Sequence, residues 1–245
     1  MKSWGKPMVG CVLIVFIAIF VCCSEKADTQ VTTADAGMAV SGEKITYAIK
    51  QLGIKAGEAT LVYQGHASGE AEDIHLIVFT ADGMNFYDQE KIYFNIQEFI
   101  PVRVERDLNI AGNKEKIVEH YEPEKNQIRI VKTVGRSTKE QVVKKEGPVD
   151  NIYCFIYRYR KNGLLAVNES LNLRLPTRDV VMKAVEQTKL KAGREFYEVC
   201  HLQSDPDKYH VWFDVGPKRM PLRIDGAVGF GKTSMIMMKY ESQGE

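Results

Sequence analysis

The stretch GEKITYAIKQLGIKAGEATLVY, residues 42–63, decides the fold class of this chain. Residues 45–49 and 58–63 are rich in β-branched, aromatic and aliphatic side chains, which favour strands. Between them, residues 52–57 include two glycines and predict a turn. The stretch therefore predicts an antiparallel β-hairpin.

The same pattern continues along the rest of the chain. Turn residues separate successive short runs of strand-forming residues, at a spacing of roughly 8 to 12 residues that is typical of an antiparallel meander. The further predicted strands are residues 74–80, 91–99, 102–110, 116–121, 127–133, 138–145, 171–175, 180–185, 196–202, 209–215, 220–224 and 234–240. We therefore expect a mainly β protein.

One helix is predicted over residues 150–162. Asp150 can cap it, Gly163 can end it, and apolar residues recur at helical spacing in between. These are Ile152, Phe155, Ile156 and Tyr159, which would form one stripe that packs on the sheet.

The composition limits the class of protein. The chain has 245 residues, 44% of them hydrophobic and 27% charged, which is typical of a globular protein and not of a disordered one. The formal net charge is +1, so no basic excess indicates a nucleic-acid partner. Without an internal repeat, residues 42–245 are expected to form a single domain.

The first 23 residues indicate export. Lys2 and Lys6 precede an apolar run over residues 8–23 that ends in Cys22-Cys23-Ser24, typical of a bacterial lipoprotein signal. Cys23 would carry the lipid, and an uncleaved N-terminal anchor is the alternative. Residues 24–41 have the composition of a flexible tether. Both alternatives place the domain at a membrane of the bacterial envelope, on the periplasmic side, and Ser24 favours the outer membrane in a Gram-negative host.

The order of these segments resembles an exported bacterial family. The resemblance covers about residues 41–240 and rests on residues 42–47 and 53–59, on Asp150 before an aromatic-rich helix, and on residues 211–214 and 219–221. The family is domain of unknown function 3108. The resemblance implies an antiparallel, clam-like sheet or open barrel in the envelope, and it brings no established activity and no catalytic residues.

Residues 226–233 read GAVGFGKT, a literal match to the phosphate-binding loop G-x-x-x-x-G-K-T. In nucleotide-binding proteins a helix follows this loop directly, whereas here residues 234–240 predict a strand and the chain ends soon after. We expect a glycine-rich hairpin turn and not a P-loop NTPase.

The histidines and cysteines of the sequence do not form a recognisable metal-binding motif. None of the five histidines stands at metal-ligand spacing, so we expect no metal and no cofactor. Cys154 and Cys200 are the only cysteines after the signal. Two alternatives stay open for them, a disulfide in an oxidising compartment and two buried free thiols.

Aromatic residues are the candidate ligand-binding residues. Tyr93, Phe94, Tyr153 and Tyr157 either pack in the core or line a cleft for a lipid chain or a sugar ring. The sequence favours a membrane-tethered, non-catalytic envelope domain that binds or positions an amphiphile, a glycan or an envelope protein. The alternative is an envelope hydrolase or transferase whose site is not visible in the sequence.

Overall fold

The computed structural model describes residues 39–163, 165–228 and 233–242. The predicted signal, Cys23, and residues 24–38 of the predicted tether lie outside them. Every described residue belongs to one compact unit, Thr32–Glu245. No helix in the described part of the chain is long and apolar enough to cross a membrane.

Each of the fourteen predicted strand segments corresponds to a strand. They are β1 (Glu43–Gln51), β2 (Ile54–His66), β3 (Ile74–Gly83), β4 (Phe86–Asn95), β5 (Ile100–Ile110), β6 (Asn113–Glu122), β7 (Gln127–Val134), β8 (Ser137–Lys144), β9 (Ser170–Leu175), β10 (Arg178–Ala192), β11 (Glu195–Asp205), β12 (His210–Asp214), β13 (Pro221–Asp225) and β14 (Thr233–Glu241). A 3-10 turn, η1 (Pro123–Lys125), joins β6 to β7.

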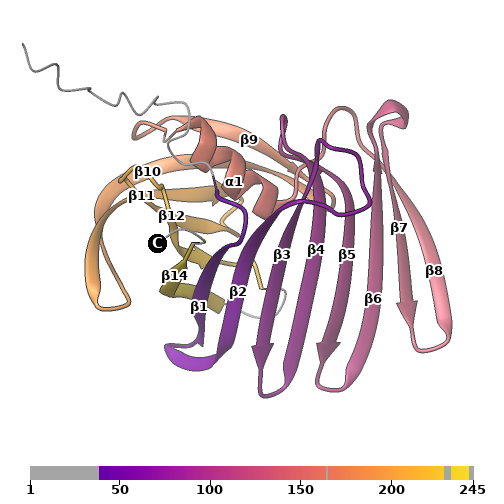
Figure 1. Cartoon of the computed structure of the whole chain (residues 1–245), viewed down its shortest axis with the longest axis horizontal. Helices are drawn as coiled ribbons and strands as arrows, with labels where there is room; N and C mark the ends of the chain where they lie inside the picture. Colours follow the sequence, from indigo (N-terminus) through magenta and orange to yellow (C-terminus); the bar gives the residue numbers. More distant parts are fainter. Residues whose placement is uncertain (1–38, 164, 229–232, 243–245) are drawn as a thin grey trace, which may run out of the picture. The chain divides into compact units, whose positions relative to one another are not determined.

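All fourteen strands belong to one antiparallel sheet, in the order β8-β7-β6-β5-β4-β3-β2-β1-β14-β13-β12-β11-β10-β9. The first and last strands, β1 and β14, are therefore neighbours in the middle of the sheet (Figure 1). The sheet is not closed, since β8 and β9 are its two edges. This confirms the predicted fold class, a curved antiparallel sheet with one helix.

The first hairpin is tighter than predicted. Only Leu52 and Gly53 separate β1 from β2, and both have positive φ, +50° and +83°. Two residues of positive φ form the hairpin turn whose twist matches that of the paired strands. The rest of the predicted turn, residues 54–57, begins β2.

The helix α1 (Ile152–Asn162) has a different cap from the one predicted. Asn151 is the N-cap, and its side-chain oxygen accepts a hydrogen bond from the Tyr153 amide at 2.8 Å. Asp150 cannot take that role because it lies beside β9, where its amide donates to the Arg174 carbonyl at 2.6 Å. The Asp150 carboxylate pairs with Arg158 instead, at 2.6 Å.

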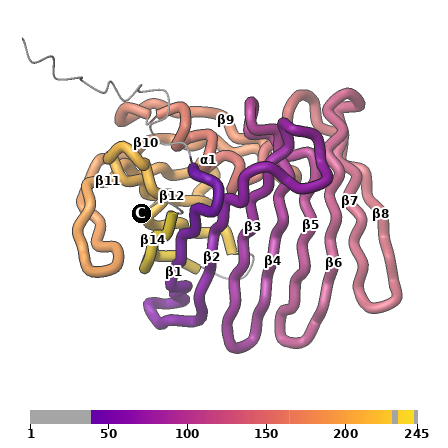
Figure 2. Tube along the Cα trace, in the orientation of Figure 1, coloured from indigo at the N-terminus to yellow at the C-terminus, as the bar shows by residue number. Residues whose placement is uncertain are grey.

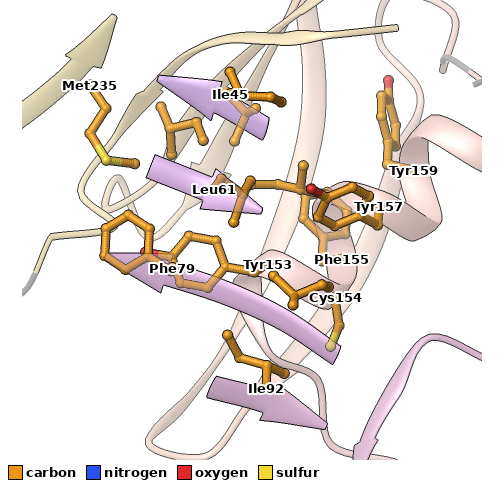
Figure 3. Close-up of a cluster of buried hydrophobic side chains, with 14 of the residues drawn as sticks. Ile45, Leu61, Phe79, Ile92, Tyr153, Cys154, Phe155, Tyr157, Tyr159 and Met235 are labelled. Atoms are coloured by element: carbon orange, nitrogen blue, oxygen red, sulfur yellow. The ribbon is translucent and has the colours of Figure 1, made fainter. Parts of the chain in front are cut away.

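The helix lies inside the curl of the sheet and contacts both halves of it. Tyr153 stacks on Phe79 of β3, with ring centroids 4.6 Å apart, and Tyr159 packs on Phe213 of β12 at the same centroid distance. The helix is therefore buried on most of its circumference and not on a single stripe. Figure 3 shows its aromatic side chains against the inner faces of β1 to β4.

A buried ion pair fixes the end of the helix to the first strand. Nη1 and Nη2 of Arg160 donate to the Glu43 carboxylate, at 2.6 and 2.9 Å, and each side chain is 1% exposed. Such a two-pronged pair has a fixed geometry as well as a favourable energy. It sets the position of the helix along β1.

Candidate functional site

The four predicted ligand-binding aromatics do not share one surface. Phe94, Tyr153 and Tyr157 are at most 2% exposed and lie between the helix and the sheet. Phe94 and Tyr157 pack on Tyr63, and Tyr153 stacks on Phe79. Tyr93 lies on the opposite face of β4, under the Arg103 guanidinium at 3.9 Å. In this conformation the first three fill the core, so a ligand would have to displace the helix to reach them. Binding by these residues stays a prediction.

Cys154 and Cys200 are free thiols, and both are buried. The Cys200 sulfur lies 3.8 Å from the Tyr159 hydroxyl. Burial raises the pKa of both thiols, which keeps them protonated and unreactive. Of the two alternatives, the structure contains the free thiols and not the disulfide.

The glycine-rich match at residues 226–233 connects two antiparallel strands. Asp225 of β13 pairs with Ser234 of β14, and Thr233 begins a strand where a phosphate-binding loop would begin a helix. Residues 229–232 of the motif lie outside the described residues.

A cluster of charged residues lies on the concave face of β4, β5 and β6. We call Asp88, Glu90, Arg106, Glu119 and Tyr121 the acidic cluster. Asp88 and Glu90 alternate with outward-facing residues in β4, in phase with the buried Ile92 and Phe94, so their side chains also point inward. Glu90 pairs with Arg106 in the neighbouring strand, which places the guanidinium on the same face.

The contacts within the acidic cluster are short. The Arg106 guanidinium donates two hydrogen bonds to the Asp88 carboxylate, one of them at 2.7 Å, and its Nε lies 3.3 Å from Glu90 Oε1. The Tyr121 hydroxyl donates to Glu119 at 2.7 Å. Two carboxyl groups thus contact one guanidinium, with the Glu119 carboxyl nearby, and the Asp88 side chain is only 1% exposed.

The surroundings change the ionisation of two of these carboxyl groups. Burial raises the pKa of Glu90 to about 7; the Arg106 charge opposes this shift, and the charges of Asp88 and Glu119 add to it. Burial also raises the pKa of Glu119, against the hydrogen bond from Tyr121. One guanidinium therefore does not compensate the negative charge of the cluster.

A cavity of about 200 Å³ opens beside the acidic cluster. Glu90, Arg106 and Glu119 form its charged wall, while the start of α1 at Asn151 and the β9–β10 turn at Thr177 form the other side. Behind this wall, the buried Tyr153 hydroxyl has no hydrogen-bond partner among the described residues. A buried polar group without a partner is unusual in a folded protein.

Apolar residues continue from the cavity along the concave face. Leu108 and Ile110 follow Arg106 at alternate positions of β5, and Ile117 lies opposite Arg106 in β6. All three are partly exposed. The concave face therefore combines a charged pocket with an adjoining apolar surface, which we call the apolar strip.

Sequence reasoning missed the acidic cluster. Charged residues that alternate with apolar ones along a strand are typical of a face exposed to solvent. The Glu and Lys residues of these strands show that pattern, so the sequence indicates a solvated face. One signal in the sequence could have found it. Residues 88 and 90 stand at the same alternate positions as the apolar residues 86, 92 and 94, so in a strand all five side chains point to the same face.

The structure also brings two histidines together that the sequence left apart. His201 of β11 and His210 of β12 lie with Nε2 and Nδ1 3.0 Å apart, and Glu186 and Asp207 contact their other ring nitrogens. Trp212 stacks on His201 at 4.2 Å. No group of three or more potential metal ligands occurs among the described residues.

Comparison with known proteins identifies a family without an assigned activity. Residues 44–239 match the profile of the family described as Protein of unknown function (DUF3108). No curated protein matches the sequence significantly.

Three solved structures resemble the fold at low sequence identity. A beta-barrel-like protein of domain of unknown function DUF1849 from Brucella abortus has 9% identity and a TM-score of 0.49, over 83% of this chain and 98% of that chain. A "putative exported protein with YmcC-like fold" from Bacteroides fragilis has 6% identity and a TM-score of 0.29, over 84% and 98%. A "putative lipoprotein" from Parabacteroides distasonis has 9% identity and a TM-score of 0.27, over 83% and 97%.

Proposed function

Because the chain belongs to the DUF3108 family, whose members share a domain without an assigned activity, its function has to come from the site, and we propose that it binds an amphiphile with a cationic head group. The domain would be exported and held at an envelope membrane by its N-terminus. The head group would enter the cavity beside the acidic cluster, and the apolar chain would lie on the apolar strip.

The observation that carries this proposal is the excess of carboxyl groups over cations in the acidic cluster. Asp88 and Glu90 both pair with the guanidinium of Arg106, and Glu119 lies close enough for the charge of Arg106 to favour its ionised form. A buried charge without a full partner destabilises a fold unless something else compensates it. A ligand ammonium group would supply the missing positive charge and would donate hydrogen bonds to the Glu90 and Glu119 carboxylates.

The ionisation of the cluster supports a cationic ligand. Glu90, with a pKa of about 7, is partly protonated near neutral pH. An ammonium group that binds beside Glu90 and Glu119 would displace those protons, since an opposite charge stabilises the ionised carboxyl. Binding is therefore expected to release protons and to tighten as the pH rises through 7.

The apolar strip supports the choice of an amphiphile over a small hydrophilic amine. Leu108, Ile110 and Ile117 lie next to the charged wall and remain partly exposed to solvent. Covering apolar surface stabilises a complex by roughly 25 cal/mol per Å². An alkyl chain on the head group would provide that cover.

The test compares two probes with the same alkyl chain, one with a cationic head group and one with a neutral head group. Decylamine and decanol are titrated into the Thr32–Glu245 unit by isothermal titration calorimetry, in buffers of different ionisation enthalpy. We expect decylamine to bind more tightly than decanol and to release protons. The Glu90→Gln/Glu119→Gln variant should lose this difference, whereas Glu140→Gln, on the exposed edge strand β8, should keep it. Equal affinity for both probes in the parent protein would exclude the proposal.

A second candidate function has one specific observation in its favour. A carboxyl group with a pKa near 7, as burial gives Glu90, suits general acid or base catalysis at neutral pH. The domain would then be an envelope hydrolase or transferase. Turnover of an envelope lipid or glycan that disappears in Glu90→Gln and follows a pKa near 7 would support this candidate over simple binding.

A further inference from the structure

The β1–β2, β3–β4, β5–β6 and β7–β8 turns lie side by side at one end of the strands (Figure 2). Each of these hairpins has an exposed apolar residue at or beside its turn. We call this end of the strands the apolar rim. The β1–β2, β3–β4 and β7–β8 turns contribute Leu52, Met84 and Val134, which are 91%, 92% and 44% exposed, and Ile54 beside the first turn is 75% exposed. Ala111 occupies the β5–β6 turn and is also exposed.

Leu52 occupies a backbone position that does not suit it. Its φ is +50° at the first position of a two-residue turn, with Gly53 following at +83°. Asparagine, aspartate and glycine are strongly preferred there because a larger side chain is strained at positive φ. A leucine at this position improves neither the turn nor the core, since its side chain contacts mainly solvent. Such strain at an exposed apolar residue points to a role outside the folded domain.

The turns at the two ends of β1 to β8 differ in charge. The turns of the apolar rim, with their flanking residues, carry more basic than acidic groups: Lys50, Lys55, Lys114 and Arg136 against Asp82. The turns at the opposite end of these strands, with their flanking residues, are acidic: Glu70, Glu72, Asp73, Glu98, Glu122 and Glu124 against Lys125. Only the apolar rim therefore combines apolar tips with basic flanks.

This combination fits a lipid bilayer with anionic head groups. Apolar side chains that enter the boundary between head groups and acyl chains, next to lysine and arginine, are the usual elements of reversible membrane binding. A protein partner would require a continuous complementary surface, whereas separate tips on four neighbouring turns suit a fluid surface. The acidic turns at the opposite end of these strands would be repelled by the same membrane, which fixes the orientation of the domain.

We propose that the apolar rim is a membrane-docking surface, with Leu52, Ile54 and Met84 inserted among anionic lipids. This contact is separate from the N-terminal lipid or anchor and does not depend on the acidic cluster. In this orientation the turns of the apolar rim contact the membrane, and β1 to β8 extend away from it.

The test measures binding of the Thr32–Glu245 unit, which has no N-terminal anchor, to vesicles by cosedimentation. Vesicles of phosphatidylethanolamine and phosphatidylglycerol (3:1) are compared with vesicles of phosphatidylcholine alone. We expect binding to the anionic vesicles that weakens with added salt, and at least tenfold weaker binding by the Leu52→Asn/Ile54→Thr/Met84→Ser variant.

The variants separate loss of binding from loss of folding. Leu52→Asn puts a preferred residue into the turn, so its thermal unfolding midpoint should stay equal or rise while membrane binding falls. Val40→Thr, at an exposed position before β1, is the matched control and should bind like the parent. Absence of vesicle binding by the parent protein, or equal binding by the triple variant, would overturn the proposal.

Discussion

Replacing Glu90 by glutamine tests whether the acidic cluster contains uncompensated charge. Burial raises the pKa of Glu90 to about 7, whereas glutamate in an unfolded chain has a pKa of about 4.3. Between these two pH values the native state binds more protons than the unfolded state, so the free energy of unfolding falls as the pH rises. The stabilising contribution of protonated Glu90 is fully present below the pKa of the unfolded state, and it is lost as the pH rises through the pKa of the native state. At about 1.4 kcal/mol per pKa unit, the difference between the two pKa values corresponds to a loss of about 4 kcal/mol.

Glutamine has nearly the same shape and is neutral at every pH. We therefore expect Glu90→Gln to match the parent protein near pH 5 and to exceed its free energy of unfolding by about 1 to 3 kcal/mol near pH 8. Urea unfolding of both proteins at these two pH values measures the difference. The control Glu140→Gln, on an exposed strand, should show no pH-dependent gain. If Glu90→Gln gains no more at high pH than at low pH, the reasoning on uncompensated charge is wrong.

Three further predictions concern other parts of the chain. Arg160→Met should lower the free energy of unfolding by about 3 to 5 kcal/mol, because it leaves the Glu43 carboxylate buried without its partner; urea unfolding checks this. Thiol titration of unfolded, unreduced protein should find free Cys154 and Cys200, and folded protein should react slowly; fewer than two free thiols after unfolding would show a disulfide. Cys23→Ala should abolish acyl labelling in cells, and labelling that persists would exclude Cys23 as the lipidation site; the cysteine before it should be mutated in parallel.

The strands were predictable because their signals are local. Alternating β-branched and aromatic residues between glycines mark each hairpin without reference to the rest of the chain, as residues 42–63 illustrate. The helix was predictable for the same reason, but its cap was not. Both Asp150 and Asn151 can cap a helix, and only the contact of Asp150 with β9 decides between them.

The candidate site was not predictable because it depends on long-range arrangement. Asp88, Glu90 and Arg106 become a buried cluster only when the sheet curls around the helix and excludes water from that face. The aromatics Tyr153 and Tyr157 are a matching case. Their spacing fits either a cleft or a core, and the docking of α1 inside the curl places them in the core.

The pairing of β1 with β14 has a consequence for how this protein folds. Lys44 pairs with Glu241, so the central ladder cannot form until the last strand has been synthesised. Contacts of such sequence separation form slowly because a long loop must close first. Until then β1 presents an unpaired edge that can join other chains. Deleting β14 would therefore remove the middle of the sheet and not its margin, and would leave two unjoined halves that are prone to aggregate.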